Sequence, residues 1–293
     1  MGSLREIKDR IASVRSTLKI TSAMKLVASS KLRRSQKAIE TMLPYKQALE
    51  DILEALQPAP QAASGYDGGS PEEIKDSPAG GRTLIIGISS NSSLCGAFNT
   101  NAVKAALAAA SECGEVEMVG IGRKMSEALK KAGHPQSDDL SALVAKPDYM
   151  ESSAFAQEVM DRFEAGEFSC VKLVYNHFVS SSRQVPVTEV WLCAAPVAQE
   201  QGRTEPAAGN EDYIFEPSAS RISEGLRPRV LKLKFHAALL DSAASEHAAR
   251  TIAMQTASDN AEDLLSELTL EYNKGRQQKI TDELLDIVGG SIE

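Results

Sequence analysis

The sequence predicts an α/β fold in which a long antiparallel coiled coil of the N- and C-terminal helices accompanies a Rossmann-like α/β domain. Apolar residues repeat at coiled-coil spacing at both ends of the chain, and short β-branched segments alternate with helical ones between them. Of the 293 residues, 42% are hydrophobic and only 5% aromatic, a balance that favours long helices over an all-β fold. We expect a helix at 1–57, a flexible loop rich in Pro and Gly at 58–81, the α/β domain at 82–217 and a second long helix at 218–293.

The N-terminal helix is predicted by a seam of residues that step by alternating threes and fours, as in a coiled coil. The seam residues are Leu4, Ile7, Ile11, Val14, Leu18, Thr21, Lys25, Ala28, Leu32, Ser35, Ile39 and Met42. Between Thr21 and Ser35 small or charged residues replace the bulky apolar ones. We expect Pro44 to interrupt or kink the helix and Pro58 to end it near Gln57. At about 1.5 Å per residue such a helix runs on the order of 80 Å.

The C-terminal helix is predicted by a second, alanine-rich seam that begins after Pro228. The seam residues are Leu240, Ala243, His247, Arg250, Met254, Ala257, Ala261, Leu264 and Leu268. Only Gly275 could break the helix before Gly289, so we expect roughly 55 to 60 helical residues, which need a partner helix to stay ordered. The two seams therefore predict an antiparallel pair, with roughly the last 20 residues protruding beyond Met1.

The middle of the chain has the pattern of a βαβ arrangement. Strands are expected at 83–89, 116–122, 170–180 and 184–196, and helices at 99–111, 124–132 and 152–164. The last two strands are joined by a short polar turn, so they should form an antiparallel edge on an otherwise parallel sheet.

Charge is unevenly distributed along the chain, although the net charge is only −8. The segment 10–37 carries eight Lys or Arg residues and no acid, whereas 241–293 carries eleven acids and four bases. The two ends should therefore attract each other. No apolar stretch is long enough to span a membrane, and the charged N-terminus lacks a signal peptide's apolar core, which together indicate a bacterial cytoplasmic protein without direct membrane insertion.

The Ser-rich turn after the first strand, GISSNSSLCGAFNTN, is where a Rossmann-like fold would bind a phosphate. The turn lacks both the GxGxxG glycines and the P-loop lysine, so close packing of helix on sheet at Gly96 is favoured over nucleotide binding. Ser92, Ser93 and Cys95 have no GxSxG elbow around them and are interpreted as turn-forming residues.

Metal and thiol chemistry are not expected. The histidines have no partners at metal-ligand spacing on the same element; they are His134, His177, His236 and His247. The cysteines are not closely spaced and are interpreted as reduced apolar residues; they are Cys95, Cys113, Cys170 and Cys193.

The basic segment 10–37 could in principle contact nucleic acid. No aromatic residue is interleaved with its bases, and the acidic C-terminal helix competes for them. A basic face that meets acidic loops of a surrounding protein fits the weak seam at Met24 and Lys25 better. The chain is thus predicted to be an interaction protein. A stand-alone coiled-coil scaffold that binds nucleic acid is the second hypothesis, and a nucleotide-dependent enzyme the third.

Three segments closely resemble the γ subunits of F-type ATP synthases: IKDRIASVRSTLKITSAMKLVASSKLRRSQ, SLCGAFN, and the C-terminal run from SEHAARTIAMQ to DELLDIVGG. The resemblance implies a central rotor without cofactor or catalysis of its own. Its terminal helices would turn inside the hexamer of α and β subunits, while the α/β domain sits with the ε subunit on the c-ring of the membrane sector. It also implies a peripheral position on the cytoplasmic face of the bacterial inner membrane. No cysteine pair of the chloroplast regulatory kind is present, so thiol control of rotation is not expected.

The resemblance also implies contact roles. The residues expected to face the β subunits are Met24, Lys25, Arg276, Gln277 and Thr281. Those expected near the membrane ring are Tyr213, Phe215 and Glu216. Those expected to form an apolar bearing in the collar of the hexamer are Leu284, Leu285, Ile287 and Val288.

Overall fold

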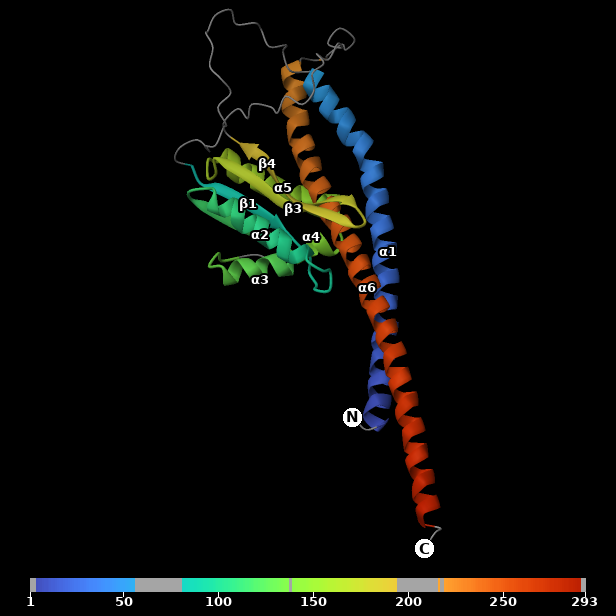
Figure 1. Cartoon of the computed structure of the whole chain (residues 1–293). Coiled ribbons are helices and arrows are strands. Elements are labelled where there is room, and N and C mark those ends of the chain that lie inside the picture. Colours follow the sequence, from blue (N-terminus) through green and yellow to red (C-terminus); the bar gives the residue numbers. More distant parts are fainter. Residues whose placement is uncertain (1–3, 56–80, 137–138, 194–215, 217–218, 291–293) are drawn as a thin grey trace, which may run out of the picture.

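The computed structural model describes residues 4–55, 81–136, 139–193, 216 and 219–290. Two long helices, α1 (Leu4–Ala55) and α6 (Ala219–Gly290), run side by side along one side of the molecule, and the α/β domain packs on α6 (Figure 1). The predicted loop at 58–80 and most of the connection before α6 lie outside the described residues.

The two long helices are antiparallel, as predicted. Leu49 near the end of α1 packs with Val230 near the start of α6, and midway along the pair Thr21 Oγ1 lies 2.8 Å from Ser258 Oγ. The described part of α6 is 72 residues long against 52 for α1. The longer helix therefore extends past the N-terminal end of its partner (Figure 1).

Gly275 marks where the pairing ends. The Leu4 side chain lies so close to Gly275 that a Cβ at this glycine would stand 3.2 Å from Leu4 Cδ2. Since Leu4 is the first described residue of α1, residues 276–290 of α6 continue beyond it, a length of about 22 Å at 1.5 Å per residue. We call these residues the tip. The protruding C-terminus that the unequal seams predicted is thus observed.

The predicted seam of α1 is correct throughout, since each of its residues is buried or half-buried. The seam of α6 needs one correction: Leu264 is 43% exposed, and Leu265 is half-buried instead. The covered residues of α6 in this stretch step from Ala261 to Leu265 to Leu268, so only the position of Leu264 moves by one residue.

The prolines do not end either helix. Pro44 lies inside α1 and Pro228 inside α6. The helix α6 starts at Ala219 and thus before Pro228, after which its seam was predicted to begin. Beyond Pro44, Leu49 is buried against α6, and this contact stabilises a helical turn that has lost one backbone hydrogen bond. Packing between the two helices thus outweighs the local penalty.

The α/β domain contains a four-stranded sheet with the order β2-β1-β3-β4. Its strands are β1 (Thr83–Ile88), β2 (Val116–Ile121), β3 (Cys170–Ser180) and β4 (Arg183–Cys193). β1 pairs in parallel with β2 and β3, whereas β4 is antiparallel to β3, which confirms the mixed sheet and its antiparallel edge.

Helices cover both faces of the sheet. α2 (Phe98–Ser111) and α3 (Arg123–Lys131) pack on one face. The other face is covered by α4 (Ser141–Ala145), α5 (Tyr149–Glu164) and the middle of α6. The short helix α4 was not predicted, and α5 begins earlier than expected because the Asp148 carboxylate accepts a hydrogen bond from Met150 N, capping the helix.

The middle of α6 belongs to the domain core as well as to the helix pair. Phe235 is fully buried, with its ring centroid 5.4 Å from those of Phe155 on α5 and Trp191 on β4. The Trp191 indole N–H also donates to Leu231 O of α6 at 3.0 Å. We call this set of contacts the junction; it fixes the domain to the helix pair.

Candidate functional site

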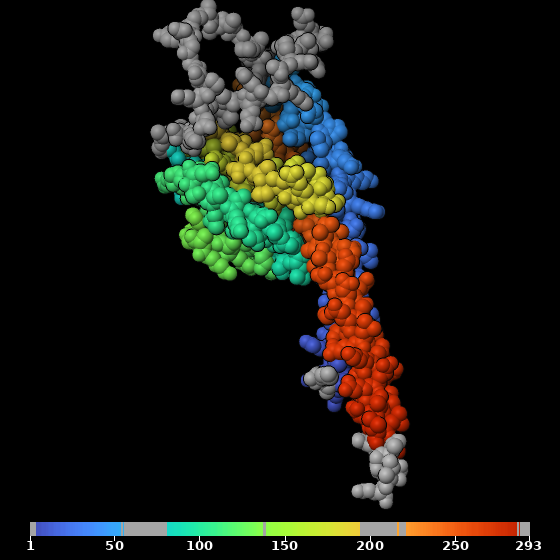
Figure 2. Space-filling model, viewed as in Figure 1, coloured from blue at the N-terminus to red at the C-terminus, as the bar shows by residue number. Residues whose placement is uncertain are grey.

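Large apolar side chains are exposed on α1 within residues 20–27. Ile20, Leu26 and Val27 are 57%, 70% and 57% exposed. Farther along, the helix pair leaves the domain as a narrow rod (Figure 2). Single exposed apolar residues are ordinary, but three within eight residues of one helix indicate a surface that meets a partner.

The predicted contact residues Met24 and Lys25 lie in this segment, and both are half-buried. Lys25 occupies a seam position and forms no ion pair with any described residue. Their contact role stays a prediction. The most exposed apolar side chain beside them is that of Leu26, followed by Ile20 and Val27. Their signal was an apolar residue at a position outside the seam.

The tip carries the predicted polar contacts. Arg276, Gln277 and Thr281 are all exposed, and Thr281 Oγ1 donates to Gln277 O at 2.9 Å, one turn away. The three residues follow Gly275, so they lie where α6 has no described partner helix alongside it.

The end of the tip is apolar. Leu284, Leu285 and Ile287 are 57%, 64% and 68% exposed, and Val288 lies in the same helix with its side chain outside the described part. Of the three residues predicted near a membrane ring, Glu216 is exposed, whereas Tyr213 and Phe215 lie outside the described residues. The structure therefore brings the tip residues together and leaves the ring contacts undecided.

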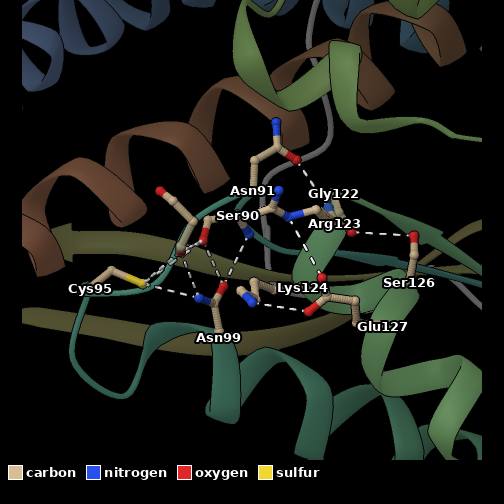
Figure 3. Close-up of polar contacts among 10 residues, drawn as sticks. Ser90, Asn91, Cys95, Asn99, Gly122, Arg123, Lys124, Ser126 and Glu127 are labelled. Carbon is tan, nitrogen blue, oxygen red and sulfur yellow. Dashed lines mark hydrogen bonds and ion pairs between the residues drawn. The ribbon is translucent and has the colours of Figure 1, made fainter.

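Several polar groups of the turn between β1 and α2 bond to one another and to the start of α3 (Figure 3). Asn99 Oδ1 accepts from Ser90 N at 3.1 Å, and Asn91 Oδ1 accepts from Arg123 N, the first residue of α3, at 3.0 Å. Lys124 N donates to Ser90 O at 3.1 Å. These bonds hold the turn against the start of α3, and they occupy the amides of Ser90, Arg123 and Lys124.

The glycines of this region have packing and conformational roles. A Cβ at Gly122 would collide with Ser89 O, so β1 and the start of α3 can approach only because this residue is glycine. The expectation of close packing at Gly96 was wrong: no atom lies within 4 Å of the position its Cβ would take. Gly96 is required instead for its left-handed backbone, with φ of +58°.

Arg250 joins this turn to α6. Its Nη2 donates to Ser92 Oγ at 2.8 Å and to Ser93 O at 3.3 Å, and its Nη1 lies 2.8 Å from Glu246 Oε1. Burial raises the pKa of the Glu246 carboxyl, while the neighbouring Arg250 acts in the opposite direction. Burial, with Lys31 and Arg250 nearby, lowers the pKa of His247 to about 4. This polar cluster is a second attachment of the domain to α6, in addition to the apolar junction. The seam position of Arg250 in the sequence did not predict these contacts.

Catalytic and metal-binding geometry is not found in the described part of the chain. No group of three or more His, Cys, Asp and Glu side chains there could hold a metal ion. Ser92 Oγ accepts its hydrogen bond from a cation rather than donating to a base. Within the described ranges, no helix has the length and apolarity needed to cross a bilayer.

Comparisons with known proteins agree over nearly the entire sequence. The profile of the ATP synthase family matches residues 3–292. The ATP synthase gamma chains of Phocaeicola vulgatus and Bacteroides thetaiotaomicron are 45% and 44% identical to this chain, and each alignment covers 100% of both sequences. Among solved structures, the rotor of the Euglena gracilis mitochondrial ATP synthase is similar in fold, with a TM-score of 0.61 at 19% identity over 95% of this chain and 99% of the other.

Proposed function

The chain belongs to the ATP synthase gamma chain family, and on that premise we propose that it is the central rotor shaft of a proton-translocating F-type ATP synthase. In this role the helix pair turns inside a hexamer of α and β subunits. Rotation driven by the c-ring changes the conformation of each catalytic β subunit in turn. The Euglena gracilis neighbour is described as a rotor and the Tetrahymena thermophila neighbour as a central stalk with a c-ring, which fits this assignment.

The observation that carries the proposal is the double role of α6. One stretch of this helix, around Phe235, is buried in the α/β domain, while the same helix pairs with α1 and continues to the tip. A torque applied to the domain therefore passes into the shaft through a single continuous helix rather than through a linker. A rotor needs this stiffness, whereas a scaffold that only gathers partners does not.

We propose that the exposed surface of the helix pair contacts the β subunits. Met24 and Lys25, flanked by the exposed Leu26 and Val27, would face the moving lever of a β subunit. Arg276, Gln277 and Thr281 would meet its catch loop. A ligand or partner shifts a conformational equilibrium only by contacting its states differently, so an asymmetric shaft favours a different state in each β subunit.

The tip and the base of the shaft have further proposed partners. Leu284, Leu285, Ile287 and Val288 would turn in the apolar collar of the hexamer. Tyr213, Phe215 and Glu216 would lie near the c-ring, with the ε subunit beside the α/β domain. The complex would stand on the cytoplasmic face of the bacterial inner membrane, with this chain as a peripheral subunit.

We propose that the chain has no catalytic activity of its own and that ATP is processed on β. The turn after β1 supports this, since it lacks both the GxGxxG glycines and the P-loop lysine that bind nucleotide phosphates. Calorimetric titration of the purified chain with Mg-ATP should show no binding in the micromolar range. Micromolar affinity would mean that the α/β domain has been misinterpreted.

Co-purification tests the shaft. The full chain, tagged and co-expressed with its α and β subunits, should recover both of them, whereas recovery of nucleic acid would favour the scaffold hypothesis. The double variant Leu26→Glu, Val27→Glu should reduce recovery of the hexamer or its coupling to proton pumping. Ala48→Glu is the control, because Ala48 is exposed on the same helix but lies near its far end, next to Leu49, which packs on Val230 of α6. Equal behaviour of the two variants would contradict the proposed contact surface.

A further inference from the structure

Three of the four cysteines meet at one end of the sheet, although they are far apart in sequence. Cys170 is the first residue of β3 and Cys193 the last residue of β4, and the antiparallel register pairs them directly. Cys113 follows α2, and Lys172 Nζ donates to its Sγ at 3.4 Å. All of these cysteines are free thiols in the structure.

The geometry of the pair suits a disulfide. Residues directly opposite each other in an antiparallel sheet project to the same face, with Cα atoms roughly 4.5 to 5.5 Å apart. Disulfides are compatible with Cα separations of about 4.4 to 6.8 Å. The neighbouring Cys193 thiol, together with burial, raises the pKa of Cys170, as expected for two thiols that lie close together. The sulfur atoms can therefore be joined without moving the strands far.

We propose that Cys170 and Cys193 are a reversible thiol–disulfide pair, oxidised by low-molecular-weight disulfides of the glutathione class. One protein thiolate attacks the external disulfide, forming a mixed disulfide and releasing one small thiol. The second protein thiol loses its proton to solvent, attacks the mixed disulfide and displaces the second small thiol. The chain loses two electrons and two protons, and one external disulfide becomes two thiols.

Accessibility sets the order of the two steps. Cys193 is half-buried, whereas Cys170 is only 3% exposed. Burial also raises the pKa of Cys170 to about 12, so little of it is thiolate at neutral pH. Cys193 is therefore the thiol that meets the oxidant, and Cys170 is the one that resolves the mixed disulfide.

The bond would form beside the junction. Trp191, two residues before Cys193 on β4, contacts Phe235 and donates to Leu231 O of α6. Tying the end of β4 to β3 holds the strand that carries Trp191. Oxidation would thus keep the edge strand β4 paired with β3 at the place where the α/β domain packs on α6.

The test uses the full-length reduced chain, incubated with oxidised glutathione, alkylated and digested for mapping of linked peptides by mass spectrometry. We expect a link between the peptides of Cys170 and Cys193, reversed by dithiothreitol, while Cys95 stays alkylated. The urea-denatured chain under the same oxidant is the control that shows the oxidant to be competent. The proposal would be overturned if Cys170 and Cys193 of the native chain were both recovered as alkylated thiols. It would also be overturned if Cys193 were linked to Cys113 instead.

Matched variants separate the pair from its neighbours. Cys113→Ser and Cys95→Ser should leave the link intact. Cys193→Ser should abolish it and leave Cys170 unmodified, and Cys170→Ser should leave a persistent glutathione adduct on Cys193. Circular dichroism of each variant checks that it folds. If the buried Cys170→Ser variant does not fold, the peptide mapping of the unmodified chain still decides the proposal. Oxidation of Cys170 in Cys193→Ser, either to a glutathione adduct or to a disulfide with Cys113, would refute the assigned order of the two thiols.

Discussion

Truncating Phe235 to Ala should weaken the attachment of the α/β domain to the helix pair more than any surface change. The side chain is fully buried, and removal of a buried Phe costs about 3 to 5 kcal/mol because apolar contacts are lost and a cavity remains. Two aromatic neighbours with centroids 5.4 Å away place the expected loss in the upper part of that range.

The chain offers its own probe for this experiment, because Trp191 is the only tryptophan and its ring contacts Phe235. Urea unfolding of the isolated full-length chain would be followed by tryptophan fluorescence, which reports on the junction, and by far-ultraviolet circular dichroism, dominated by the helices. We expect the fluorescence midpoint of Phe235→Ala to move to markedly lower urea.

Leu270→Ala is the matched control on the same helix. Leu270 is 71% exposed, so its truncation should change stability by no more than about 0.5 kcal/mol. A loss of less than about 1 kcal/mol in Phe235→Ala, or one equal to that of Leu270→Ala, would refute the claim that α6 is a core helix of the domain.

Three further predictions concern the helix pair. Ser258→Ala should destabilise the isolated chain by about 1 kcal/mol, since it removes the hydrogen-bond partner of buried Thr21; unchanged urea unfolding would show that this bond contributes nothing. The pKa of His247 is about 4 in the folded chain and 6.5 for the free side chain, so the unfolded chain binds more protons between these two pH values. The contribution of His247 to folding stability is therefore fully present above pH 6.5 and is lost as the pH falls toward 4. His247→Gln should therefore flatten the pH dependence of unfolding in that window by up to about 1.4 kcal/mol per pH unit, and a slope identical to that of the unmodified chain would contradict this. Lys25→Glu should cost at most about 1 kcal/mol of stability but lower ATP-driven proton pumping in the reassembled complex more than hydrolysis; lost stability with unchanged pumping would assign Lys25 to the coiled coil alone.

The long helices and most of the sheet could be predicted because their signals are local. A seam that steps by threes and fours records which face of a helix is buried, and the twelve predicted seam positions of α1 are buried or half-buried accordingly. The boundaries were less certain where tertiary contacts outweigh propensity, as at Pro228, which lies inside α6.

The candidate contact surface was found partly through periodicity and partly through resemblance. The loosened seam drew attention to the segment around Lys25, and the tip followed from the unequal lengths of the two helices. Periodicity cannot say how far an off-seam side chain is covered by other elements, so the exposure of Leu26 and Val27 emerged only from the structure.

Residue spacing alone predicts two long paired helices around an α/β domain, because the periodicity of a helix or strand is a local property of the chain. How these parts are joined is seen only in the folded molecule. Phe235 enters the domain core, Arg250 bonds to the turn after β1, and Cys170 lies opposite Cys193. Each of these contacts joins elements far apart in sequence, and such partners are chosen by the path of the folded chain, which no local pattern of residues encodes.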